Sequence, residues 1–333
     1  NSEVFKFALE YFTYIILGIP FYVFGQAMNP IISADGSPNY VMFSTLCGAL
    51  INIIFDPIFI FKFNWGMMGA AVATVMGQIF TAMMSLIYIS HKMKAVNFSR
   101  KNISYHPALM KKYLPLGLCS FLSQISIVIS VAAVNTMIKK YGSVDEIFSR
   151  AEYSQIPMAV IGIVMKFFQI VISIVVGLSA SCTPIVGFNI GAGRKDRAKN
   201  LFTRLLICES VIGIIAFLIV EIFPAHIAEL FGASGESEIY LNYTVKSFRT
   251  YLCLIIFACI NKAAFIFIQA LGRAWVSAGL SMTREIIFGA GLTIIMPIWM
   301  GLDGVLWSMP AADGLTFIVS ILVIMMIYKD LSK

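Results

Sequence analysis

Charged residues are scarce in this sequence. They make up 12% of the 333 residues, whereas an ordinary soluble domain contains about 25%. Hydrophobic residues reach 59%, well above the roughly 45–50% of soluble domains. This composition excludes an ordinary soluble domain and indicates an integral membrane protein.

Histidine and cysteine are also few, and neither follows a ligand pattern. The six cysteines all lie in apolar runs without a CxxC pair, which is typical of buried free thiols. The three histidines lie between these runs and have no HExxH spacing. We also find no nucleophile elbow and no pair of carboxylates with catalytic spacing. We therefore expect no enzyme activity, no structural metal and no cofactor.

Long apolar runs account for most of the chain. Each has room for the roughly 20 helical residues that cross a bilayer. Several of the turns between them are only a few residues long, so we expect antiparallel neighbours in an all-α polytopic bundle. We place nine spans at residues 8–31, 39–61, 67–90, 113–138, 158–188, 200–223, 247–271, 277–300 and 304–328.

Lysine and arginine concentrate in alternate loops, between the third and fourth spans and between the fifth and sixth. The positive-inside rule predicts that both loops and the C-terminus are cytoplasmic. The net charge of +7 then reflects topology, and we do not expect nucleic-acid binding.

An internal repeat links the two ends of the chain. Residues 27–36 resemble 263–272, and 65–78 resemble 300–313, at offsets of 236 (263 minus 27) and 235 (300 minus 65). The second alignment places Gly66 on Gly301 and Gly69 on Gly304. Chance similarity between apolar helices is the alternative.

A parallel repeat of this kind predicts a transporter with two six-helix lobes. We expect residues 1–91 to be the C-terminal half of the first lobe, 92–112 a cytoplasmic linker and 113–333 the second lobe. Three more helices would precede residue 1, which gives twelve in all.

A carboxyl group interrupts the second apolar run. Asp56 and Asn52 are four residues apart and project from one face of a helix. Thr74 lies at a similar depth on the next span, and Pro57 has no N–H to donate to the carbonyl of Ile53. These oxygens suit a hard cation such as Na⁺, and an aspartic acid away from water suits a proton. Alternatively, Asp56 only caps the helix and Asn52 bonds a neighbouring helix.

A second set of polar side chains lies on later spans. Lys166, Lys262, Arg284 and Glu285 can line a substrate cavity or reach an interface. Arg284 and Glu285 point about 100° apart on an α-helix, so we do not expect one ion pair between them. Pairing with Lys262 or Lys166 across a cavity is one alternative, and reaching an interface is the other. Gln124 either lines the cavity or bonds another helix.

Two segments resemble one family. The run NIIFDPIFIF…WGMMGAAVATVMGQ (52–78), the segment PIVGFNIGAGRKDRAK (184–199) and the six-plus-six repeat are similar to the multidrug and toxic compound extrusion (MATE) transporters, close to their DinF/Mep-like branch. The resemblance implies two lobes around a central cavity and export of cationic or amphipathic organic compounds in exchange for Na⁺ or H⁺.

The resemblance also implies a cation site in the first lobe. Asn52, Asp56 and Thr74 match an Asn, an Asp and a Thr of the family, and Tyr11 matches a Tyr. The family's first-helix Asp has no counterpart here. NorM-like members carry a Glu on the span where this chain has Gln124 or Ile127, so we do not expect a cation site of that type in the second lobe.

We therefore expect a secondary-active antiporter, monomeric and multi-pass, in a bacterial inner membrane. One alternative keeps the fold and changes the cargo to lipid-linked saccharides, for which we expect a large cavity rich in basic residues. The other is a non-transporting membrane protein.

Overall fold

The computed structural model describes residues 2–94, 107–233 and 237–332, and these residues form helices joined by short connections, without strands. The chain divides into two compact units, Asn1–His106 and Pro107–Lys333. The division falls inside the basic segment expected as a linker, and α4 (Pro107–Gly142) already begins within it.

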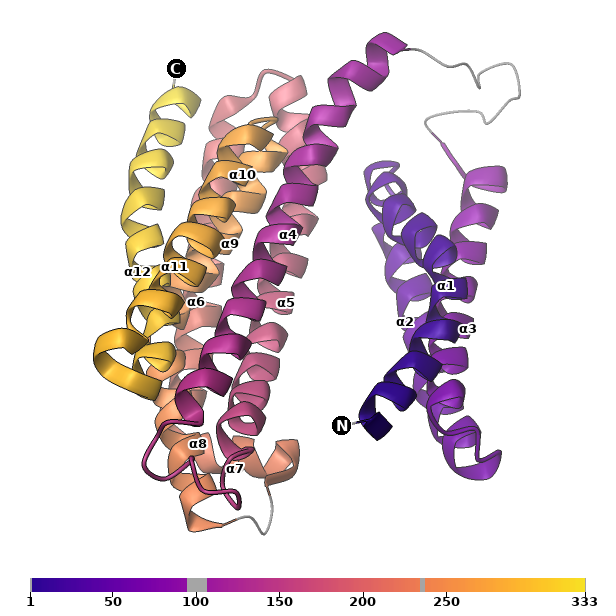
Figure 1. Ribbon diagram of the computed structural model, residues 1–333. Helices are drawn as coiled ribbons and strands as arrows, with labels where there is room; N and C mark the ends of the chain where they lie inside the picture. The colour runs from indigo at the N-terminus through magenta and orange to yellow at the C-terminus, as the bar shows by residue number, and fades with distance from the viewer. Residues whose placement is uncertain (1, 95–106, 234–236, 333) are drawn as a thin grey trace. The chain divides into compact units, whose positions relative to one another are not determined.

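The first unit is a bundle of three long helices (Figure 1). Its elements are α1 (Ser2–Ala34), α2 (Pro38–Pro57), the π-helical segment η1 (Ile58–Lys62) and α3 (Gly66–His91). The central helix is α3, which packs against both others. It does so through small side chains such as Ala71, Ala73 and Gly77, all buried. Small residues let helix backbones approach closely within a membrane.

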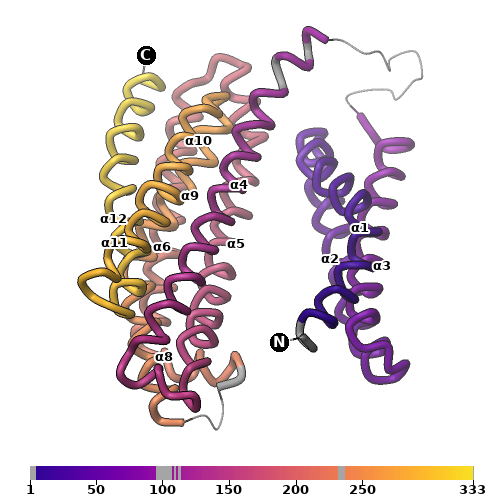
Figure 2. The backbone as a smooth tube through the Cα atoms, viewed as in Figure 1, coloured from indigo at the N-terminus to yellow at the C-terminus, as the bar shows by residue number. Residues whose placement is uncertain are grey.

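The second unit contains the remaining helices, and their order along the chain can be followed by colour in Figure 2. After α4 come α5 (Ile156–Gly191), α6 (Lys195–Ile222), α7 (Pro224–Ala228), η3 (Glu229–Ala233), α8 (Glu238–Tyr251), α9 (Ile255–Ala270), α10 (Ala274–Met282), η4 (Thr283–Ala290), α11 (Gly291–Ile295) and α12 (Pro297–Leu331).

The number of spans agrees with the sequence. Within residues 2–94, 107–233 and 237–332, eight helical segments are long and apolar enough to cross a membrane, and α8 with α9 makes a ninth if this pair, bent by 47°, counts as one span. The 16 residues of α9 cover only about 24 Å, less than a bilayer core of about 30 Å. The seventh span is therefore broken, where the sequence predicted one continuous run over 247–271.

The last two spans meet close to the expected boundary. The sequence predicted a turn at 301–303, and Gly301, with φ 58° and ψ −138°, is a non-helical residue between two helical stretches of α12. The stretch from Pro297 to Gly301 follows α11, which ends at Ile295. Because glycine has no Cβ, it tolerates a positive φ, and the helix breaks at the predicted turn.

The backbone repeats where the sequence repeats. Gly36 and Gly272 have φ values of 86° and 81°, and Gly66 and Gly301 have 53° and 58°. The N–H of Gly36 donates to the carbonyl of Ser33, and that of Gly272 donates to the carbonyl of Gln269. Each aligned pair thus has a glycine with a similar positive φ, and the Gly36 and Gly272 turns share a hydrogen bond as well, which supports the internal repeat over chance similarity.

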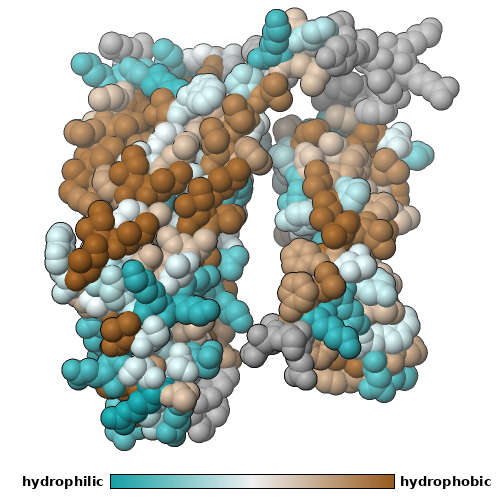
Figure 3. Space-filling model, viewed as in Figure 1, coloured by the Kyte–Doolittle hydropathy of each residue, from teal (hydrophilic) through white to brown (hydrophobic). Residues whose placement is uncertain are grey.

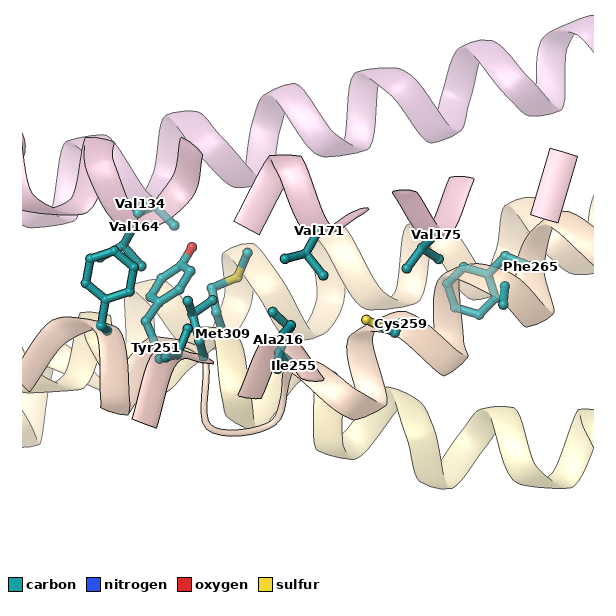
Figure 4. Packing of buried hydrophobic residues seen from close by; sticks show 14 of the residues in the cluster. Val134, Val164, Val171, Val175, Ala216, Tyr251, Ile255, Cys259, Phe265 and Met309 are labelled. Atoms are coloured by element: carbon teal, nitrogen blue, oxygen red, sulfur yellow. The ribbon is translucent and has the colours of Figure 1, made fainter. Parts of the chain in front are cut away.

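Large apolar side chains form the core of the second unit. Figure 4 shows Val171 and Val175 of α5 beside Cys259 and Phe265 of α9, with Tyr251 and Met309 further along the same core. On the face seen in Figure 3, apolar side chains cover much of this unit and hydrophilic ones gather toward its ends. This distribution is typical of a bundle whose middle lies in lipid.

Candidate functional site

Three of the predicted polar residues meet between α2 and α3. The side-chain N–H₂ of Asn52 lies 3.4 Å from Oδ1 of Asp56 and 3.2 Å from Oγ1 of Thr74. The Thr74 hydroxyl in turn donates to the carbonyl of Ala70 at 2.9 Å. Asn52 therefore links a carboxyl group on its own helix to a hydroxyl on the next.

Two glycines allow this contact. A Cβ on Gly77 would lie 2.5 Å from the carbonyl oxygen of Gly48 and 3.7 Å from the Cβ of Asn52. The backbones of α2 and α3 are thus in direct contact one helical turn from the cluster. Close approach at Gly48 and Gly77 brings the short side chains of Asn52 and Thr74 within hydrogen-bond distance.

A change of helix type marks the end of the cluster. Pro57 closes α2 next to Asp56, and the chain continues as the π-helical segment η1. Proline cannot donate a backbone hydrogen bond, and π-helical turns often occur at functional positions. The carboxyl group therefore lies where the regular backbone hydrogen bonding of the span is interrupted.

Asp56 has only neutral hydrogen-bond partners. Within the ranges that the structure covers, no lysine or arginine forms an ion pair with it. The Asp56 carboxylate and the Thr74 hydroxyl offer oxygen ligands of the kind that hard monovalent cations prefer, and Asn52 faces both with its N–H₂. Tyr11, the fourth residue assigned by resemblance, is half-buried on α1, and no hydrogen bond joins it to the other three. Its role stays a prediction.

The second unit holds a different cluster. The Nε of Arg284 donates to Oδ1 of Asp313 at 2.9 Å, and Arg284 also pairs with Glu285. The three side chains are 13%, 5% and 10% exposed, respectively. Asn261 donates to the backbone carbonyl of Asp313 at 3.1 Å. The cluster therefore ties α9, η4 and α12 together.

The expectation that Arg284 and Glu285 do not pair was wrong. It relied on the directions of neighbouring side chains along an α-helix, but these residues lie in the π-helical segment η4. The long arginine side chain also has enough rotatable bonds to reach its neighbour while it binds Asp313. The lysines considered as partners, Lys166 and Lys262, form no ion pair with Glu285.

The remaining predicted residues fall into two places. Gln124 and Lys262 line one cavity of about 240 Å³, together with Gln269 and serines of α4 and α10. Lys166 is exposed and lies at a separate surface pocket with Gln169 and Phe231. Gln124 and Lys262 thus share one cavity, whereas Arg284 and Glu285 belong to the ion-paired cluster, and binding of substrate in that cavity stays a prediction.

Two further carboxyl groups lie inside the second unit and were not predicted from the sequence. Asp313 is bound to Arg284, and Glu209 of α6 is fully buried. The hydroxyl of Ser179 donates to one oxygen of Glu209 at 2.9 Å, and the other oxygen has no partner among the described residues. Both residues lie inside apolar runs, so the rule that singled out Asp56 identifies them as well.

Comparison with known proteins supports a single family. The MatE family model matches residues 1–58 and 120–295. The multidrug export protein MepA of Staphylococcus haemolyticus is 24% identical over 316 residues, which is 94% of this chain and 66% of that protein. MepA of Staphylococcus aureus (strain MSSA476) is 24% identical over 335 residues, or 100% and 70%. The chain spans about two thirds of the length of these relatives.

Solved structures show the same fold. An outward-facing multidrug resistance MATE family transporter of the MOP superfamily superposes with a TM-score of 0.87 at 22% identity, over 98% of this chain and 71% of that one. An inward-facing structure of such a transporter gives 0.75 at 22% identity, over 100% and 74%.

Proposed function

The chain belongs to the MatE family, and we propose that it acts in secondary-active efflux of amphipathic organic compounds in exchange for Na⁺ or H⁺. Its curated relatives are multidrug export proteins, which supports this cargo class. The chain is a multi-pass membrane protein, with eight to nine spans among the residues that the structure describes. We place it in a bacterial plasma membrane as a monomer, with a cytoplasmic C-terminus.

The contact among Asn52, Asp56 and Thr74 carries this proposal. A carboxyl group inside a membrane span is costly and is therefore a functional candidate. Here it accepts a hydrogen bond from the neutral side chain of Asn52, which also donates to Thr74, and it has no counter-cation among the described residues. A coupling cation would supply the missing positive charge, and Tyr11 would add its hydroxyl to this site.

Coupling follows from competition between conformations. A ligand shifts an equilibrium only by its difference in affinity for the two states. Cation binding at Asp56 favours one conformation and cargo binding favours another, so the downhill movement of the cation drives export. The cluster joins α2 to α3, so occupancy changes the packing of spans directly.

Dye efflux tests the role of Asp56. Cells that express the chain are compared with Asp56→Asn at several Na⁺ concentrations and pH values. Asparagine still accepts a hydrogen bond from Asn52 but carries no charge, so we expect efflux that no longer depends on either ion, or no efflux. Glu152→Gln makes the same chemical change at an exposed turn and should behave as the unmodified chain does. Ion-dependent efflux that survives in Asp56→Asn would refute the coupling role.

The flippase alternative has less support. A flippase for lipid-linked saccharides should present several basic groups in one large cavity. Of the three basic residues considered, Lys262 alone lines the 240 Å³ cavity, while Arg284 is paired with carboxylates and Lys166 lies elsewhere.

A further inference from the structure

We propose that the cavity bounded by α4, α9 and α10 is a binding site for an acidic group, such as the carboxylate of an amphipathic cargo molecule. The proposal deepens the proposed efflux function, and it rests on that function because it takes the ligand to be a transported compound. It assigns one substrate class, compounds that carry an oxyanion, to the second unit. The site is distinct from the Asp56 cluster, which lies in the other unit.

The lining of the cavity has a single sign of charge. Lys262 is its one charged residue, and no aspartate or glutamate lines it. The other polar lining groups are amides and hydroxyls, including Gln124, Gln269 and Ser281, and Phe265 adds an apolar wall. An organic cation would meet an ammonium group without a carboxylate to offset it. An oxyanion would meet a positive charge and neutral hydrogen-bond donors.

Three polar groups that line the cavity have no hydrogen-bond partner among the described residues. Gln269 donates to Ser120 at 3.0 Å, and Ser277 donates to the carbonyl of Phe265 at 2.7 Å. By contrast, Lys262, Gln124 and Ser281 have no hydrogen bond or ion pair within the described part of the chain. They come from three different helices, α9, α4 and α10, and line the same space. An ammonium, an amide N–H₂ and a hydroxyl can therefore all donate hydrogen bonds to one ligand in the cavity.

The ammonium of Lys262 lacks a direct counter-ion. Glu285 and Arg284 both act on it electrostatically, but Glu285 is in direct contact with Arg284, and Asp313 is bound to the same guanidinium. A half-buried ammonium without a contact partner is costly in an apolar span. A ligand oxyanion would form the missing pair as a charge-assisted hydrogen bond.

The size of the cavity limits what enters it. Its volume of about 240 Å³ is below the roughly 300–1,000 Å³ of pockets that enclose a drug-sized molecule. The acidic group and a few adjoining atoms fit, and the remainder of an amphipathic ligand would lie outside the cavity.

Fluorescent probes of matched shape test this proposal. Dansylglycine carries a carboxylate, dansylglycinamide replaces it with a neutral amide, and a dansyl quaternary ammonium of similar length carries the opposite charge. Binding to the purified full chain in detergent is followed by fluorescence anisotropy. We expect the carboxylate probe to bind most tightly. Lys262→Met should weaken it about tenfold or more, because a charge-assisted hydrogen bond is lost.

Several controls separate a lost charge from a lost fold. Lys262→Arg keeps the charge and should bind the carboxylate probe within about threefold of the unmodified chain. Lys139→Gln removes an exposed lysine about 22 Å further along α4 from Gln124 and should change nothing. The neutral probe should bind Lys262→Met as well as it binds the unmodified chain. If the methionine variant does not fold, Gln124→Leu and Ser281→Ala should each weaken the carboxylate probe alone.

Two results would overturn the proposal. One is tighter binding of the quaternary ammonium probe than of the carboxylate probe. The other is unchanged carboxylate binding in a folded Lys262→Met. Because the measurement involves no transport, it stays separate from dye efflux: failure of the Asp56→Asn experiment leaves this site intact, and failure here leaves ion coupling at Asp56 intact.

Discussion

The Asp56 cluster of the first unit and the Arg284 cluster of the second hold their carboxyl groups in opposite electrostatic settings. In the first, Asp56 meets only an amide and, through it, a hydroxyl. In the second, Glu285 and Asp313 share the guanidinium of Arg284. The first carboxylate has an unmet charge, and the second pair has its counter-ion built into the chain.

This difference separates a ligand site from a structural one. Two charges taken out of water are tolerated when they pair closely and their remaining hydrogen bonds are met. Arg284 balances the charge of Asp313 on α12 by binding its carboxylate. The side-chain N–H₂ of Asn261 on α9 donates to the backbone carbonyl of the same Asp313. An unpaired carboxylate instead gains from any cation that reaches it. We therefore expect substitutions in the second cluster to affect stability and those in the first to affect ion binding.

The largest effect should come from Arg284→Met. The change leaves Glu285 and Asp313 buried without their cation, so it should lower the free energy of unfolding by about 3–5 kcal/mol. Thermal unfolding of the purified protein in detergent measures this loss.

Arg273→Met is the matched control for that experiment. Arg273 pairs with Asp330 at 2.7 Å, but both side chains are 46% exposed, and an exposed pair contributes about 0–1 kcal/mol. Equal losses in the two variants would show that the Arg284 cluster is as well hydrated as a surface pair, and the comparison between the units would then fail.

Gly77→Ala should have the next largest effect. Its new Cβ would lie 2.5 Å from the Gly48 carbonyl oxygen, a backbone atom that cannot move without separating α2 from α3. We expect a loss of about 1–3 kcal/mol in stability, together with weaker cation binding because Asn52 moves away from Thr74. Unfolding at several Na⁺ concentrations reports both effects.

Gly117→Ala makes the same change where nothing lies within 4 Å of the new Cβ. In the middle of α4, alanine is favoured over glycine by up to about 1 kcal/mol, so this variant should be as stable as the unmodified chain or more stable. A neutral result for Gly77→Ala as well would mean that α2 and α3 separate freely, and that their contact does not position the site.

The sequence predicted much of the fold because membrane spans depend on simple properties. Span length and apolar content located nine segments, and the alignments that place Gly36 on Gly272 and Gly66 on Gly301 predicted turns that share their backbone conformation. The break between α8 and α9 could not be predicted in this way. Apolar content continues across Leu252 and Leu254, so hydropathy contains no signal for the bend.

Side-chain contacts in the two clusters could be predicted where the residues are close along the chain or lie at the same depth in the membrane. Asn52 and Asp56 are four residues apart on one helix, and Thr74 follows after one short turn, so counting along two helices placed them together. Arg284 and Asp313 are separated by 29 residues, and their contact depends on how η4 rotates its side chains toward α12. A period of 3.6 residues gives the wrong rotation for a π-helical segment, which is why the Arg284–Glu285 pair was excluded in error.

Tyr11 offers the smallest and sharpest test of the first-unit site. Family resemblance places it there, while the structure shows no hydrogen bond from it to Asp56, Asn52 or Thr74. Thr74→Val removes an oxygen that already accepts a hydrogen bond from Asn52, so the cation affinity read from Na⁺-dependent or pH-dependent stabilisation should fall about tenfold. Tyr11→Phe removes a hydroxyl that forms no hydrogen bond to the other three residues, so it should lower that affinity about threefold. A loss as large as that of Thr74→Val would make Tyr11 a direct ligand, and no loss at all would restrict the site to α2 and α3.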